Sequence, residues 1–252
     1  LQASNNFRFM TTKNSGTSTA HRTEAGWAYG YPELSAAHRE AIRTGKRIAV
    51  PGCYATGFIT TAYALTAGGI LPKDYPVSAF AVSGYSGGGK KMIAQYQAQD
   101  KEKELSSARL YALSQSHKHL KEMKAISGLE RTPLFSPMVT DYYSGMTVSL
   151  TFYADMLNGR QTPETVREYL AKHYAGEKFI TVQPLGAEAE SGGVLFSSAR
   201  SGWDGLEIYV TGNEDRIMVT TRFDNLGKGA SGAAIQCMNI VLGCEEDKGL
   251  TV

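Results

Sequence analysis

Cys53 stands in the stretch of this chain that is best suited to covalent chemistry. Residues 47–50, apolar after Arg47, predict a short strand, a Pro-Gly pair predicts a turn, and residues 56–67 predict a helix. A thiol at the start of a helix lies at the positive end of the helix dipole, which lowers its pKa and favours the thiolate. This order predicts a nucleophile for an acyl carbon, and a buried structural thiol is the alternative.

The run 117–122 offers the acid-base partner that such a thiol needs. His119 and Glu122 are three residues apart, so on a helix they share a face and the carboxylate can orient the imidazole. A solvated charged turn is one alternative. A metal site is another, with His117 and His119 as a pair and His21 as third ligand, but this set is not convincing and the sequence predicts no metal.

Two glycine-rich stretches could bind a ligand through their backbone. Residues 83–90 follow a predicted strand, and residues 224–232 precede the last predicted helix. Successive amides and a helix start suit an anionic or amide-bearing ligand, although a tight turn and a flexible loop are the simpler interpretations. Residues 84–90 also fit G-x-x-x-x-G-K, but Lys91 stands where a nucleotide triphosphatase requires Ser or Thr.

The remaining elements predict an α+β protein. Met146, Val148, Leu150 and Phe152 alternate onto one face of a strand. The region before residue 77 has the pattern of the end of an α/β unit, and the rest favours a largely antiparallel or mixed sheet. Besides residues 47–50 and 56–67, the predicted elements are a helix at 35–44, a strand at 77–83, mostly helix at 90–124 with an interruption near 114–119, and a strand at 144–157. They continue with a helix from Thr162-Pro163, a hairpin of 206–211 with 216–223, and a last helix ending near 242.

Composition narrows the class of protein. The chain has 252 residues, 20% of them charged, and a net charge of +2. It therefore has no electrostatic footprint for nucleic acid, and no apolar run approaches the roughly 18 residues of a membrane span. Three cysteines in no framework spacing favour a reduced, cytoplasmic location.

Several motifs, in order, carry a family resemblance over nearly everything from residue 18 onward. The chain resembles the N-acetyl-gamma-glutamyl-phosphate reductases of arginine biosynthesis, in their shorter subtype. The resemblance implies a glyceraldehyde-phosphate-dehydrogenase-like catalytic domain at 53–223, a remnant of an NAD(P)-binding Rossmann domain at 1–52, and a C-terminal loop and helix at 224–252 that pack back toward that domain. The matching stretches are 18–23, 26–34, 51–54, 83–90, 117–119, 135–137, 145–146 and 224–232.

The resemblance also implies the reaction and the roles of residues. Cys53 would attack N-acetyl-glutamyl 5-phosphate to form a thioester, and NADPH would reduce it to N-acetylglutamate 5-semialdehyde. His119 would be the acid-base residue, oriented by Glu122. Arg22, Tyr54 and His117 would bind substrate. The residues implied on the cofactor side are Ser18, Ser83, Gly84, Ser86, Gly87, Asn225 and Lys228.

The chain departs from the family pattern in ways that suggest an alternative to an active reductase. The glycine fingerprint of the dinucleotide-binding domain is absent, so we expect a chain that lacks most of that domain. Val50, Ala55 and Lys121 replace the usual Asn, Pro and Pro. The resemblance implies a homodimer or homotetramer with a small acyl-phosphate substrate. A non-catalytic relic or interaction module of the same family is the alternative, and a cofactor-independent thiol hydrolase is a third possibility.

Overall fold

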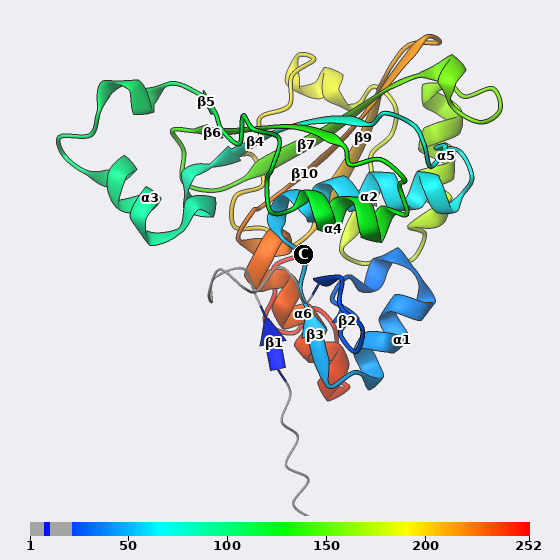
Figure 1. Cartoon of the computed structure of the whole chain (residues 1–252), viewed down its shortest axis with the longest axis horizontal. Helices are drawn as coiled ribbons and strands as arrows, with labels where there is room; N and C mark the ends of the chain where they lie inside the picture. Colours follow the sequence, from blue (N-terminus) through cyan, green and yellow to red (C-terminus); the bar gives the residue numbers. More distant parts are fainter. Residues whose placement is uncertain (1–7, 11–21) are drawn as a thin grey trace, which may run out of the picture.

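The computed structural model describes residues 8–10 and 22–252, and these residues form two sheets with their helices (Figure 1). A small parallel sheet, with α1 and α6, lies on one side of the molecule. A large mixed sheet, with α2 and α4 on one of its faces, makes up the rest. The predicted α+β class is confirmed. Ser18 and His21 lie outside the described residues.

The small sheet is formed by early residues and is packed with a helix from late in the sequence. Its described strands run in the order β1 (Arg8–Met10), β3 (Arg47–Ala49) and β2 (Ala28–Tyr29). Helix α1 (Ala36–Thr44) begins at Ser35, whose side chain accepts from the amide of His38 as predicted. Helix α6 (Gly232–Leu242) packs on α1. The shared core joins Ile42 and Ile48 to Cys237 and Ile240, so the last helix completes a core begun near the start of the chain.

The large sheet mixes parallel and antiparallel pairs. Within the described residues its order is β5-β6-β4-β7-β10-β9-β8, in which β4 and β6 are parallel, β8 and β9 are parallel, and the other pairs are antiparallel. The strands are β4 (Ser78–Gly84), β5 (Arg109–Leu110), β6 (Leu134–Thr140), β7 (Met146–Tyr153), β8 (Ile180–Val182), β9 (Leu206–Gly212) and β10 (Arg216–Phe223).

One face of the large sheet is covered by helices. The alternating residues of β7 point into the main core, where α2 (Cys53–Ala67) packs, and α4 (Leu120–Ser127) lies against α2. α5 (Pro163–His173) packs on β9 and begins with a capping box formed by Thr162 and Thr165. The strand, the hairpin and this helix start confirm the sequence predictions.

Three predictions of secondary structure need correction. Helix α2 begins at Cys53, three residues before the predicted start. Helix α3 (Gly89–Gln97) ends early, so most of 98–113 is irregular instead of helical, whereas the interruption predicted near 114–119 is present. Strand β6 was not predicted, and Pro137 in its middle interrupts the usual strand pattern. No helix in the described ranges has both the length and the hydrophobicity of a membrane span.

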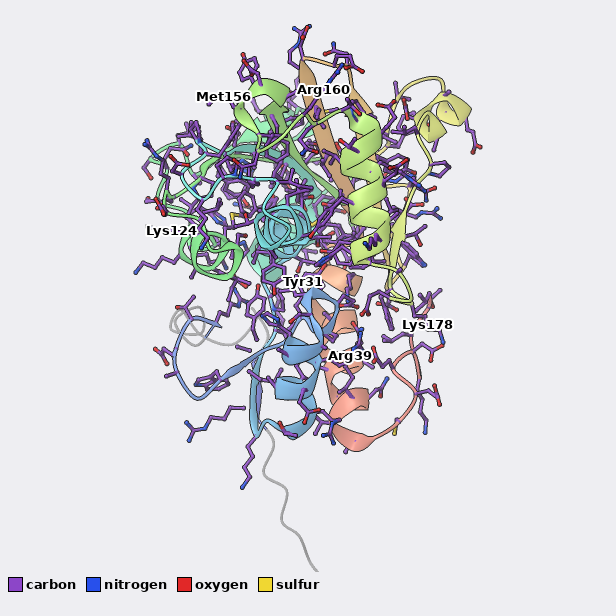
Figure 2. All side chains as sticks on the ribbon, turned by 90° about the vertical axis from the view of Figure 1, so that its right-hand side faces the viewer. Tyr31, Arg39, Lys124, Met156, Arg160 and Lys178 are labelled. Atoms are coloured by element: carbon purple, nitrogen blue, oxygen red, sulfur yellow. The ribbon has the colours of Figure 1, made fainter. Side chains whose placement is uncertain are left out.

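Buried ion pairs join the small sheet region to the rest. Figure 2 shows Tyr31 at the boundary between the two regions. There Lys228 donates to Glu33 at 2.5 Å and to Gln236 at 2.6 Å, and its ammonium lies 5.0 Å from the centre of the Tyr31 ring. Lys228 and Glu33 are almost completely buried, so they fix the residues before α6 against the start of the described chain.

Candidate active site

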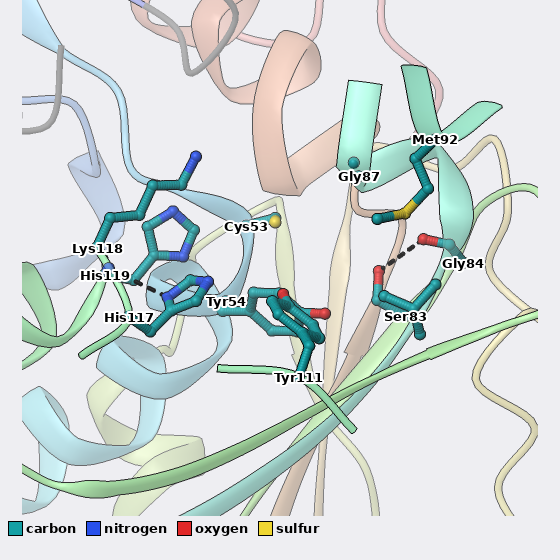
Figure 3. A pocket seen from close by; sticks show the side chains of 12 residues that line it. Cys53, Tyr54, Ser83, Gly84, Gly87, Met92, Tyr111, His117, Lys118 and His119 are labelled. Carbon is teal, nitrogen blue, oxygen red and sulfur yellow. Dashed lines mark hydrogen bonds between the residues drawn. The ribbon is translucent and has the colours of Figure 1, made fainter. Parts of the chain in front are cut away.

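Two cavities meet at Cys53. The smaller, about 220 Å³, is lined by side chains from α2, β4 and the segment before α4. The larger, about 700 Å³, lies between the glycine-rich stretch after β4 and the loop before α6. Both cavities are lined by Cys53, Gly87, Gly88 and Lys118, so the cysteine lies where the two adjoin. Figure 3 shows the smaller one.

Cys53 is the first residue of α2, and its surroundings hold it closely. The preceding Gly52 caps the helix in an extended conformation. A Cβ atom at Gly229 would lie 3.0 Å from the Cβ of Cys53, so the loop before α6 passes directly beside the cysteine. Burial raises the pKa of the thiol, while the amide of Tyr54 and the charge of Lys118 act to lower it. The expected lowering of this pKa by the helix start is therefore outweighed by desolvation.

His119 faces this turn with no hydrogen bond to its ring. It immediately precedes α4 and is 2% exposed, and both ring nitrogens lack a partner among the described residues. A Cβ at Gly52 would lie 2.2 Å from Nε2, so only glycine allows the ring to lie so close to the residue before Cys53. Burial lowers the pKa of His119 well below its ordinary value, assisted by His117, Arg22 and Lys118. The neutral ring can accept a proton.

Glu122 and Arg22 do not take the positions expected from the sequence. Arg22 donates to Glu122 at 2.9 Å and to the carbonyl of Val50 at 2.9 Å. Glu122 also accepts from the hydroxyl of Tyr29 at 2.9 Å and from the amide of Gly52 at 3.1 Å. Both side chains are about 2% exposed. The pair therefore does not hydrogen-bond the His119 ring. It binds the backbone of the turn before Cys53 at two points, the carbonyl of Val50 and the amide of Gly52.

Aromatic and imidazole rings form the wall of the smaller cavity. The Tyr54 ring packs edge-on to His117 and is tilted against Tyr111. Burial and the charge of Lys118 lower the pKa of His117 from 6.5 to about 4, so this ring is also neutral near pH 7. The amide of His119 donates to Nδ1 of His117 at 3.2 Å. Ser83 and Gly84 also line this cavity, on the side opposite the imidazoles (Figure 3).

The larger cavity has the features of a site for a flat polar ring. Asn225 accepts from the amide of Gly145 at 2.9 Å and donates to Ser86 at 2.9 Å, which fixes the amide at the cavity wall. Gly87 adds no side chain, and a Cβ there would lie 3.5 Å from Nδ2 of Asn225. The volume falls in the usual range for small-molecule sites. These residues therefore fit the nicotinamide end of a dinucleotide.

One other expected site residue that the structure describes lines neither cavity. Lys228 is held in the buried cluster with Glu33 and Gln236, so it does not face the cofactor side as predicted. Ser18 lies outside the described residues, as does His21. Among the residues that are described, no three His, Cys, Asp or Glu side chains are grouped as metal ligands.

The sequence did not identify four residues of the smaller cavity. These are Met92, Tyr111, Lys118 and Val139. Lys118 lies between two histidines that were singled out, so its position was a usable signal. Tyr111 lies in an irregular segment, and no motif around it in the sequence pointed to the cavity.

The matched family and relatives agree with one another. Residues 53–225 match the family model described as the semialdehyde dehydrogenase dimerisation domain. An N-acetyl-gamma-glutamyl-phosphate reductase 2 of Nostoc sp. is 40% identical over 241 residues, covering 92% of this chain and 75% of its own length. The Brucella ovis N-acetyl-gamma-glutamyl-phosphate reductase is 43% identical over 230 residues, covering 90% and 74%. The aspartate semialdehyde dehydrogenase structure of Francisella tularensis has a TM-score of 0.66 at 14% identity, covering 88% and 72%, and shows the same fold.

Proposed function

Because this chain belongs to the N-acetyl-gamma-glutamyl-phosphate reductases, oxidoreductases of the semialdehyde dehydrogenase family, we propose that it reduces N-acetyl-glutamyl 5-phosphate to N-acetylglutamate 5-semialdehyde through Cys53. The family uses a nicotinamide dinucleotide, and we propose NADPH for this chain. The observation that carries the proposal is the position of the Cys53 sulfur between two cavities, because the reaction requires acyl substrate and reductant on two sides of one atom.

In the first step Cys53 becomes acylated. Because burial raises the pKa of the thiol, it is protonated at rest and needs a base. The neutral His119 accepts the proton, the sulfur forms a bond to the acyl carbon, and the carbon–oxygen bond to phosphate breaks. The phosphate leaves with the electron pair of that bond, and the proton on His119 is available to its departing oxygen.

In the second step the thioester is reduced. When bound, NADPH supplies a hydride to the thioester carbon. Asn225, Ser86 and Gly87 would hold its nicotinamide end in the larger cavity beside the sulfur. Breaking the carbon–sulfur bond then releases the aldehyde and leaves the Cys53 thiolate, which regains its proton by way of His119.

The test follows NADPH oxidation with N-acetyl-glutamyl 5-phosphate as substrate. We expect turnover that is abolished in Cys53→Ser, together with a Cys53 acyl adduct that accumulates when NADPH is omitted and is visible by intact mass. Turnover that persists in Cys53→Ser would contradict the role of the sulfur. Substrate hydrolysis without NADPH would favour the thiol hydrolase instead.

We also propose that two copies of the chain associate through the open face of the large sheet. The matched family model is described as a dimerisation domain. Phe80, Leu134 and Tyr153 expose 39%, 59% and 60% of their surface, and each follows or precedes a core residue on its strand, so all three lie on the face opposite α2. Sedimentation should give a dimer or larger assembly that Phe80→Asp weakens. A monomeric wild-type chain would contradict this.

A further inference from the structure

Lys118 is a cation at the active site that the steps above do not use. It lines both cavities together with Cys53 and is exposed. Figure 3 shows its side chain passing the His119 ring, with the ammonium on the side of that ring away from His117. Its charge acts on Cys53, His117 and His119, so it lies near all three.

Of the other cations near the site, two are already paired, and Lys90 lines only the larger cavity. Arg22 is paired with Glu122, and Lys228 is paired with Glu33. Lys118 forms no ion pair or hydrogen bond within the described part of the chain. An acyl phosphate brings a phosphoryl group with negative charge to the acyl carbon, so the smaller cavity needs a cation that is free to meet it.

We propose that Lys118 binds the phosphoryl group of the acyl phosphate and keeps it beside the Cys53 sulfur while the carbon–oxygen bond breaks. The inference rests on the proposed function, because it assigns the leaving-group side of the same reaction. The ammonium attracts the charge that grows on the departing oxygen as the carbon–sulfur bond forms. It adds no bond and takes no proton, so the balance of the acylation step is unchanged.

Its location beside the base gives the same lysine a second effect. A positive charge next to His119 opposes protonation of the ring, which keeps the base neutral before the thiol proton arrives. The same charge stabilises the thiolate. These effects apply to any acyl donor, whereas phosphoryl binding applies only to acyl phosphates. The two contributions can therefore be separated by the choice of donor.

The experiment measures acylation of Cys53 without cofactor, by intact mass against time, with acetyl phosphate and with p-nitrophenyl acetate. In Lys118→Met we expect the rate with acetyl phosphate to fall about 10- to 100-fold more than the rate with p-nitrophenyl acetate. In Lys118→Arg, which keeps the positive charge, most of the rate with acetyl phosphate should be retained. Lys121→Met is the matched control, because Lys121 lies three residues further on, is exposed in the first turn of α4 and lines neither cavity.

The outcomes separate this inference from the proposed function. Equal losses with both donors in Lys118→Met would overturn phosphoryl binding and leave the nucleophile intact. An unchanged rate with both donors would also overturn it. If the wild-type chain accepts neither donor at Cys53, the proposed function fails, and this inference fails with it.

Discussion

Two sets of buried polar groups in this protein differ in whether they have hydrogen-bond or ion-pair partners. At the boundary of the two sheets, Lys228 is matched by Glu33 and Gln236. Beside Cys53, His119 is equally buried but has no partner for either ring nitrogen. Paired charges stabilise a fold only if they stay paired, whereas an unpaired buried ring costs free energy and is free to bind a proton or a ligand.

The difference separates groups that position other residues from groups that are available to react. The Arg22–Glu122 pair belongs to the first set, because all four of its hydrogen bonds are made to protein groups. His119 belongs to the second, and the exposed Lys118 beside it likewise has no partner in the described part of the chain. The predictions below test whether substitutions in the two sets have the separate effects on stability and on reaction rate that this comparison requires.

His119→Asn should give the largest effect, and on rate alone. Loss of the base should slow acylation of Cys53 by about 100- to 10,000-fold. The free energy of unfolding should change little, because the ring loses no hydrogen bond. Stopped-flow acylation and urea unfolding on the same samples provide the measurement. A large loss of stability with an unchanged rate would reverse the comparison.

Lys228→Met should act on stability first. Removing the cation leaves the Glu33 carboxylate buried and unpaired, which costs about 3–5 kcal/mol of unfolding free energy. The matched control is Lys178→Met, which breaks the exposed pair with Asp247 and should cost far less. The measurement compares the denaturant midpoints of the two variants. Equal shifts would show that burial of the Lys228–Glu33 pair does not increase the loss of stability.

Gly52→Ala should lower stability through the His119 ring, because Gly52 is bound by the paired set and contacts the unpaired one. A Cβ there meets Nε2 of His119 at 2.2 Å, so the ring must move, at a cost of about 1–3 kcal/mol. The same substitution in a His119→Ala background should cost much less, because the obstacle is gone. A double-mutant cycle in urea measures this coupling. Additive effects would mean that the close approach of ring and glycine is not what constrains residue 52.

The smallest effect should be a dependence of stability on pH. Burial lowers the folded-state pKa of His117 from 6.5 to about 4. The unfolded chain therefore binds more protons between these values, and the contribution of His117 to stability is present above 6.5 and is lost as the pH falls. Because the ring is partly exposed, the slope should stay below about 1.4 kcal/mol per pH unit. His117→Asn should flatten the profile between pH 6.5 and pH 4, and an unchanged profile would contradict the assignment.

Local signals in the sequence predicted the parts of the fold that depend on neighbouring residues. The alternation in β7 and the start of α5 at Thr162-Pro163 were correct because strand periodicity and helix capping act over a few residues. Residues 98–119 contain many helix-forming types, yet most of them are irregular, and part of the segment pairs with β6 as β5. Tertiary context overrides propensity there.

The sequence located the cysteine and the imidazoles that line the smaller cavity, and it located the charged side chains less well. Cys53 and His119 could be located from the turn and the spacing around them. The partner of Glu122 could not, because Arg22 is 100 positions away and a three-residue spacing does not show where a carboxylate turns. The location of Lys228 depends on Glu33, 195 positions earlier. Pairings at such separations leave no local pattern.

The contact between Lys228 and Glu33 also sets an order of folding. The two residues are 195 positions apart, so during synthesis Glu33 waits about 10–40 s before its partner is made. The small core around Ile42 and Ile48 stays open for the same period, because Cys237 and Ile240 come later still. The loop that carries Gly229 to Cys53 reaches its position only with this closure, so Cys53 acquires this wall long after α2 itself has been made.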